Sequence, residues 1–225
     1  PLDPEESTNY EWGIKGDFFN RRLITELAVY YMELDGRQRS VYSKPPGQAN
    51  ATPILINGDQ EFTGVEIVLN WLITDTMNLG FLTTWRDEES TWEPFYDAQG
   101  ELVVDASSDT ADTDYTFTFD WSPQISKGRL DLRAEYIFYE NSILDDPTII
   151  HPEGLKGYGE DRKLLNARAA WSTDDGKWTF GIWGKNLLDN EVTSGVDNLT
   201  LASFGTPFVR IEPPRTYGIE VAYSF

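Results

Sequence analysis

Apolar and polar residues alternate along much of the chain, and the alternation is clearest over residues 215–225. Apolar or aromatic side chains occupy every second position there: Tyr217, Ile219, Val221, Tyr223 and Phe225. Small or charged residues fill the positions between them. Since successive side chains of a strand point to opposite faces, this pattern predicts a strand with one apolar and one polar face. The segment is about as long as a tilted strand must be to cross a bilayer.

The same alternation predicts eight earlier strands, arranged as four pairs within residues 10–31, 65–85, 115–138 and 165–182. Short turns are expected inside the pairs, for example at 20–22, 74–76 and 174–176. Longer connections are expected between the pairs, at 36–60, across the acidic residues before 115, and around His151. Strict alternation of short and long connections is typical of outer-membrane barrels, which have short periplasmic turns and long outer loops.

The large aromatic residues gather near both ends of the predicted strands, as the two interfacial belts of a membrane barrel do. Those near the short turns are Trp71, Trp121, Trp171 and Trp178, and those near the long connections are Trp12, Trp85, Tyr115, Tyr136 and Tyr217. Trp183 is an exception, because the register places it on the polar face. We therefore predict an all-β protein, an antiparallel transmembrane β-barrel segment of about nine meandering strands.

A soluble β-sandwich binding module is the alternative fold, since its core would also require alternating apolar positions. It does not account for two aromatic belts, alternating connection lengths and a terminal Phe225 together.

The amino-acid composition excludes several kinds of site and argues against one class of partner. Hydrophobic residues make up 40% of the chain, and no apolar run approaches the length of a spanning helix. The absence of cysteine excludes disulfides and thiolate metal sites. A formal net charge of -20 argues against binding to nucleic acid, because phosphates would be repelled.

Few residues suggest chemistry. Carboxylates crowd residues 87–114 without Lys or Arg, but their spacing matches no EF-hand loop, so a solvated acidic loop is the favoured interpretation. Trp92 and Tyr96 within this loop are candidates for ligand contact at the barrel mouth, or they pack the loop. His151, the only histidine, is a third candidate, although one histidine builds neither a multi-histidine metal site nor a catalytic triad with a recognisable nucleophile. We expect no catalytic residue, metal or cofactor.

Several stretches resemble TonB-dependent outer-membrane receptors. Asn186-Leu187-Leu188-Asp189-Asn190, Pro214-Arg215-Thr216-Tyr217-Gly218 and the terminal Phe225 look like the C-terminus of that family. Residues 4–16, PEESTNYEWGIKG, resemble its "PE-x-S-x-NYE-x-G-x-KG" strand, and residues 61–66, EFTGVE, resemble its "GVE" strand. The resemblance runs the full length of the chain in the family's order.

The resemblance implies active uptake of a scarce ligand, such as a ferric siderophore, across the bacterial outer membrane. It also implies four partners: membrane lipid, the receptor's N-terminal plug, the TonB complex, and the barrel-assembly machinery through Phe225. Plug and TonB box are not among residues 1–225, so we expect a fragment supplying the late part of a barrel of about 22 strands. Alone, such a fragment is expected to form an open, curved sheet. A porin or an autotransporter translocator remains an alternative, and the ligand's identity stays open.

Overall fold

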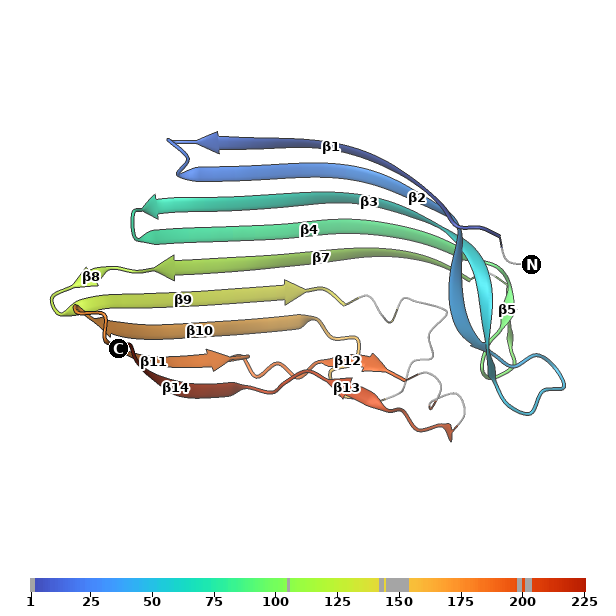
Figure 1. The fold of residues 1–225 in the computed structure, drawn as a ribbon. Coiled ribbons are helices and arrows are strands. Elements are labelled where there is room, and N and C mark those ends of the chain that lie inside the picture. Colours follow the sequence, from blue (N-terminus) through green and yellow to red (C-terminus); the bar gives the residue numbers. More distant parts are fainter. Residues whose placement is uncertain (1–2, 105, 142–143, 145–153, 198–199, 201–203) are drawn as a thin grey trace.

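A computed structural model describes residues 3–104, 106–141, 144, 154–197, 200 and 204–225. Its main element is one antiparallel sheet, in which consecutive strands lie side by side (Figure 1). The sheet follows the order β1 (Glu6–Phe18), β2 (Leu23–Ser43), β3 (Thr52–Thr74), β4 (Met77–Trp92), β7 (Ala106–Trp121), β9 (Gly128–Tyr139), β10 (Arg162–Thr173), β11 (Trp178–Lys185) and β14 (Thr216–Tyr223). The predicted meander of about nine strands is confirmed.

Three small additions accompany this sheet. The short strand β8 (Gln124–Ile125) pairs with the first residues of β9 and continues the turn after β7. Strands β5 (Phe95–Tyr96) and β6 (Leu102–Val103) form one two-stranded sheet, and β12 (Thr193–Val196) and β13 (Val209–Ile211) form another. The first lies in the acidic connection that the sequence predicts to be long, and the second lies between β11 and β14.

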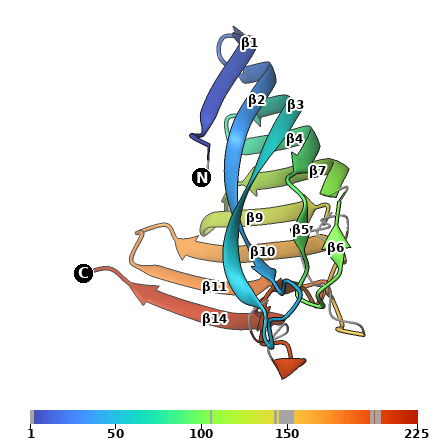
Figure 2. The same ribbon diagram turned by 90° about the vertical axis from the view of Figure 1, so that its right-hand side faces the viewer.

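The main sheet is curved and open (Figure 2). Strands β1 and β14 are its edges, and no pairing joins them in the described part of the chain. The main order contains nine strands, each antiparallel to its neighbours, so the first strand, β1, and the last strand, β14, run in the same direction. The two edge strands therefore cannot pair with each other as antiparallel strands. The expectation of an open, curved sheet is confirmed.

Short turns gather at one end of the sheet and long connections at the other (Figure 1). We call these the turn end and the long-loop end. At the turn end, Phe19, Asn20 and Arg21 reverse the chain with positive φ angles of 54°, 54° and 65°. Between β10 and β11, Gly176 has a φ of 69°, and Asp175 accepts a hydrogen bond from the Lys177 backbone N–H at 3.1 Å. The predicted alternation of short and long connections is confirmed.

The predicted loop at 36–60 is wrong, because β2 and β3 continue through most of it. After a bulge between Leu34 and Arg37, the two strands pair again from Arg37 with Gly58 to Ser43 with Thr52. Gly36 has a φ of 66° at this bulge, and a Cβ there would lie 2.6 Å from the Pro4 carbonyl oxygen. Only residues 44–51 connect the strands. The Gly, Pro and Asn residues within 36–60 predicted a loop. That stretch instead forms a strand ladder that has an apolar core of its own.

The predicted acidic loop is likewise shorter than expected. Strand β4 runs to Trp92 and β7 begins at Ala106, so many of its carboxylates lie on paired strands. Trp92 belongs to a small core of four buried residues, Val41, Ile56, Trp92 and Phe95. This core gives the long-loop end a packed structure that charge density alone does not predict, because burial is decided by residues distant in sequence.

Candidate ligand-binding cavity

Charged side chains at alternate positions pair with one another on one face of the sheet. Arg133 on β9 donates to Asp120 on β7 at 3.0 Å, and Arg168 on β10 donates to Glu220 on β14. These pairs join adjacent or next-adjacent strands. We call this face of the sheet the polar face.

Aromatic residues cover the opposite, apolar face. The rings of Phe81 on β4 and Phe117 on β7 have centroids 4.5 Å apart, and those of Tyr115 on β7 and Phe138 on β9 are 4.7 Å apart. Cross-strand aromatic pairs of this kind stabilise a sheet. The predicted separation into apolar and polar faces is therefore confirmed.

Trp183 lies on the polar face because it covers a glycine of the neighbouring strand. It pairs in the ladder with Gly218, and a Cβ at Gly218 would lie 2.7 Å from Trp183 Cζ2. Tyr30 covers Gly64 in the same way, since a Cβ at Gly64 would lie 2.2 Å from Tyr30 Cζ. The ring replaces the missing side chain of the glycine, which accounts for the exception that the sequence pattern left.

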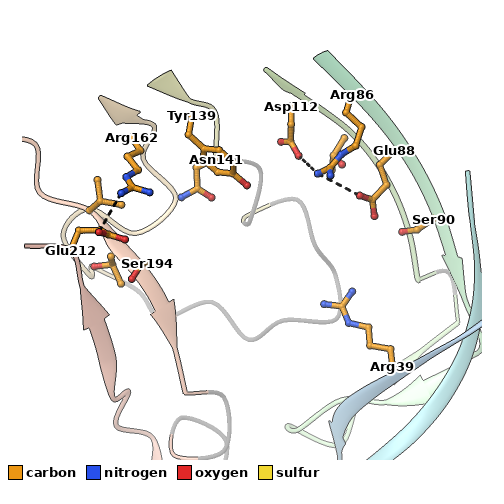
Figure 3. Close-up of a pocket in the computed structure, with 13 residues that line it drawn as sticks. Arg39, Arg86, Glu88, Ser90, Asp112, Tyr139, Asn141, Arg162, Ser194 and Glu212 are labelled. Atoms are coloured by element: carbon orange, nitrogen blue, oxygen red, sulfur yellow. Dashed lines mark hydrogen bonds and ion pairs between the residues drawn. The ribbon is translucent and has the colours of Figure 1, made fainter. Parts of the chain in front are cut away.

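Near the long-loop end, the polar side of the fold contains a cavity of about 360 Å³ (Figure 3). Its lining comes from β2, β4, β7, β9, β10 and the β12–β13 hairpin, segments far apart in the sequence. The volume lies within the range typical of small-molecule sites. This cavity is the candidate functional site.

Arg86 on β4 is the centre of one cavity wall. Its Nη2 lies 2.9 Å from Asp112 Oδ2 and 4.0 Å from Glu88 Oε2. The guanidinium carbon stands 5.9 Å from the ring centroid of Phe62, and Gln60 donates to Glu88 Oε1 at 2.9 Å. Asp112 is only 6% exposed, so its charge depends on Arg86 for compensation.

The facing wall carries a second guanidinium–carboxylate pair (Figure 3). Arg162 lies at the start of β10, and Glu212 lies just after β13. The Arg162 guanidinium donates to the Glu212 carboxylate at 3.4 Å. The β12–β13 hairpin is held beside it, because buried Thr193 donates its hydroxyl to the Lys156 carbonyl and its N–H to the Gly157 carbonyl, each at 3.0 Å. A third cationic side chain that lines the cavity is Arg39 on β2. Its guanidinium carbon lies 5.2 Å from the Trp92 ring centroid.

Buried polar atoms without a hydrogen-bond partner concentrate at this cavity. Among the described residues they are Gln60 Oε1, Arg86 Nε, Trp92 Nε1, Asp112 Oδ1, Asp114 Oδ1 and Arg162 Nε. Three belong to lining residues. Gln60 and Asp114 stand opposite the lining residues Ser90 and Tyr139 in the strand ladders, and the Trp92 ring lies beneath the guanidinium of the lining residue Arg39. Each unpaired buried group costs about 1–3 kcal/mol, so these atoms lower the local stability of the sheet around the cavity. They are buried in the wall and have almost no surface exposed to the cavity.

The structure separates the three predicted ligand contacts. Trp92 is 6% exposed and packs in the long-loop core, beside the cavity rather than in its lining. Tyr96 is half-buried on β5 and pairs with Leu102 of β6. His151 lies outside the described residues. A ligand-contact role for any of them stays a prediction.

The terminal strand has one partner only. β14 pairs with β11 from Trp178 opposite Tyr223 to Lys185 opposite Thr216, and its other edge is free of strand pairing in the described chain. The apolar side chains of this strand are exposed, in order Tyr217, Ile219, Val221 and Tyr223. Phe225 lies two residues beyond the strand end and is fully exposed. The barrel-closing role of these residues stays a prediction.

Among the described residues outside the strands, two ionisable groups have shifted pKa values. A hydrogen bond from Thr173 Oγ1 holds the pKa of Asp175 below its usual value. The hydrogen bond to Glu191, 2.5 Å away, raises the pKa of the Lys156 ammonium. Both groups are exposed. Asp175 stabilises the turn before β11, and Lys156 joins the segment before β10 to the segment before β12.

Nowhere among the described residues do three His, Cys, Asp or Glu side chains converge as a metal site. The described residues also include no helix with the length and apolar character needed to cross a bilayer.

One curved sheet with an aromatic face, an ion-paired face and short turns confined to one end defines the wall of an outer-membrane barrel protein. The sequence matches the family described as TonB dependent receptor-like, beta-barrel, over residues 1–187. The chain therefore belongs to this family, whose members are transport receptors of the bacterial outer membrane. No solved structure matches the chain. The alternative of a two-layer soluble sandwich is wrong, because the strands form a single main sheet.

Sequence reasoning missed the Arg86–Asp112 pair, although a signal for it was present. Arg86, Glu88 and Ser90 continue the alternation of β4 beyond Trp85, and all three line the cavity. Extending the strand period through the acidic stretch would have placed them on one face. The contact with Asp112 depends on the β4–β7 register, which the sequence pattern does not supply.

Proposed function

We propose that this chain forms part of the barrel wall of a TonB-dependent receptor that imports a scarce small molecule, with a ferric siderophore as the ligand class that the resemblance implies. The observation that carries the proposal is the polar cavity on the ion-paired side of a family barrel sheet. Its walls come from strands that lie side by side only in the folded sheet. Binding and transport make or break no bond, so the lining residues act by holding the ligand.

The two faces of the sheet have different tasks in this proposal. The aromatic face meets lipid hydrocarbon, where apolar side chains are required. The polar face borders the lumen, where paired charges such as Arg133 and Asp120 are stabilised by each other. The long-loop end, with the cavity, faces the outside of the cell, and the turn end faces the periplasm.

Other parts of the same receptor supply what this sheet lacks. The edges at β1 and β14 pair with further barrel strands, because unpaired backbone groups cost several kcal/mol each in lipid. An N-terminal plug fills the lumen and carries the contact with the TonB complex. The exposed Phe225 is the contact for the barrel-assembly machinery.

Energy-dependent uptake in cells tests the proposal. Cells lacking the receptor, with and without a plasmid that restores it, are given a panel of radiolabelled ferric siderophores and neutral saccharides. We expect uptake of at least one compound that requires the receptor and stops when a protonophore removes the energy supply. A matched strain lacking TonB should behave like the receptor deletion.

Two results would contradict the proposal. Receptor-dependent uptake that persists with the protonophore and without TonB would favour the porin alternative. Recovery of the full-length protein in the soluble fraction, without detergent, would exclude a membrane receptor of any kind.

A further inference from the structure

We propose that the extension of β2 and β3 beyond their bulge is a fixed arm over the polar side of the sheet, and that Asn57 and Glu5 are the residues that hold it in place. The arm comprises residues 37–58, which are the paired ends of β2 and β3 and the connection between them. Its position is a property of the fold and does not depend on which ligand the receptor takes.

The arm reaches from β2 and β3 toward the middle of the sheet. In the view from the long-loop end, it passes in front of β9 and β10 (Figure 2). Arg39 of the arm lines the same cavity as Arg162 of β10, although β3, β4, β7 and β9 lie between β2 and β10 in the sheet. The position of the arm therefore decides where one wall of the cavity lies.

Gly36 is the position at which such an arm could swing, because hinge motions are absorbed by the backbone angles of a few residues. The register of β2 with β3 shifts there, and Gly36 has a positive φ of 66°. Its N–H donates to Asp59 Oδ1 at 3.0 Å, and its carbonyl accepts from Asn57 Nδ2 at 2.6 Å. The Pro4 carbonyl oxygen lies 2.6 Å from the place of a Cβ at Gly36. Contacts on three sides therefore restrain this hinge position.

Asn57 connects the base of the arm to two segments that are distant in sequence. It is 5% exposed. Its Oδ1 accepts a hydrogen bond from the Asp3 N–H at 3.0 Å, and its carbonyl accepts one from the Glu93 N–H at 2.9 Å. Asp3 precedes β1, and Glu93 follows β4. Asn57 therefore joins the arm to the entry of one strand and the exit of another.

Glu5 holds the arm from the segment before β1. Its carboxylate accepts a hydrogen bond from the Gln38 N–H at 2.6 Å, and the Asp3 carbonyl accepts one from Gln38 Nε2 at 3.1 Å. A hydrogen bond to a carboxylate is about twice as strong as one between neutral groups. Glu5 belongs to residues 4–16, one of the stretches that carry the family resemblance. The start of this stretch therefore holds the arm as well as leading into β1.

The far end of the arm is also attached. The Lys44 N–H, directly after β2, donates to the Asp97 carbonyl at 3.0 Å. Val41 and Ile56 of the arm are buried in the core that they share with residues of β4 and β5. Moving lids are drawn from regions with few buried apolar contacts. An arm with a buried core and attachments at both ends is instead expected to keep one position.

Distances between spin labels on the full-length receptor in lipid nanodiscs test the inference. The first pair is Ser40→Cys on the arm with Lys163→Cys on β10, and the second pair, Glu66→Cys with Lys163→Cys, joins β3 and β10 within the sheet. All three positions are exposed, and the chain has no native cysteine. Pulsed electron paramagnetic resonance should give one narrow distance distribution for the arm pair and one for the sheet pair.

Matched variants connect the position of the arm to its attachments. Asn57→Ala and Glu5→Ala should each broaden the arm-pair distribution about twofold or more, because each removes hydrogen bonds at the hinge position. The sheet pair should stay unchanged, which also shows that the variant has folded. The control is Glu6→Ala, since among the described residues the exposed Glu6 side chain makes no hydrogen bond to the arm. Glu5 is exposed, so Glu5→Ala remains a test if Asn57→Ala does not fold.

Three outcomes would overturn the inference. A broad or two-peaked arm-pair distribution without any of these variants would mean that the arm moves. An unchanged distribution in Glu5→Ala and in any folded Asn57→Ala would mean that these residues do not hold it. An effect of Glu6→Ala equal to that of Glu5→Ala would mean that the attachment is not specific. None of these distances depends on uptake, so failure here is distinguishable from failure of the proposed function.

Discussion

Asp189 and Arg215 are in contact across 26 residues of sequence. Arg215 Nη2 lies 3.0 Å from Asp189 Oδ2, and the Arg215 backbone N–H donates to Asp189 Oδ1 at 3.4 Å. The contact joins two of the motifs that carry the family resemblance, residues 186–190 after β11 and residues 214–218 at the start of β14. These motifs therefore have a structural task, which is to hold the entry of the last strand.

Asn186 is the residue of this junction whose loss we expect to cost most. It is 5% exposed and donates its backbone N–H to Asn166, while its side chain bonds to Asn190 and the Pro213 carbonyl. Asn186→Ala leaves several part-buried groups unpaired, so unfolding of the receptor in detergent should be easier by about 1–3 kcal/mol. The control Asn70→Ala removes one exposed bond of 3.4 Å and should cost much less. Equal costs would contradict the junction role.

Leu132 and Arg133 test the assignment of the two faces. Leu132→Arg places a charge on the face assigned to lipid, which costs about 2–4 kcal/mol near the bilayer midplane. Arg133→Leu removes an exposed pair with Asp120, worth about 0–1 kcal/mol. Unfolding in lipid vesicles measures both. Similar costs for the two substitutions would mean that the faces are exchanged or that the sheet does not meet lipid.

Gly218 tests the account of Trp183. In Gly218→Ala the new Cβ would meet the indole at 2.7 Å, so the ring must move and the strand pair should lose about 1–3 kcal/mol of stability. The tryptophan fluorescence should shift with it. Gly195→Ala on β12 is the matched control, because no atom lies within 4 Å of the added Cβ. A harmless Gly218→Ala would refute the close packing.

Gln99 and Lys177 test the orientation in the membrane. Both are exposed, Gln99 between β5 and β6 and Lys177 in the turn before β11, and the chain has no native cysteine. A membrane-impermeant thiol reagent on intact cells should label Gln99→Cys and leave Lys177→Cys unlabelled. Both should react in broken cells. Labelling of the turn alone would reverse the assignment of inside and outside.

Asp175 predicts a small acid dependence of the turn before β11. Its pKa is lowered by the Thr173 hydroxyl, so its ionised form favours the folded turn. This contribution is present above the unfolded pKa of about 3.9 and is lost as the pH falls through the lower folded value. Acid titration of the turn amides by NMR should show the transition in the native receptor and not in Asp175→Asn. An unchanged profile in the variant would exclude Asp175 as its source.

The sequence by itself determined the strand class, the two faces and the short turns. These depend on local rules: side chains alternate along any strand, and turns such as Asp174-Asp175-Gly176 follow from residue type. The period of two therefore placed Arg133 and Leu132 on opposite faces without knowledge of their neighbours. The family motifs could also be recognised from the sequence alone, since each motif is a contiguous stretch of the chain.

Only the tertiary structure decided where the strands end and which charges meet. The ladder of β2 with β3 continues past Gly36 because Val41 and Ile56 gain a core with Trp92 and Phe95, which come from β4 and β5 and lie far away in the sequence. The cavity depends on the same long-range geometry. Arg86 and Asp112 are 26 residues apart, and Arg162 and Glu212 are 50 apart. Strand register and sheet curvature bring these pairs to facing walls of the cavity. A local sequence pattern does not contain the information on how far apart these walls lie.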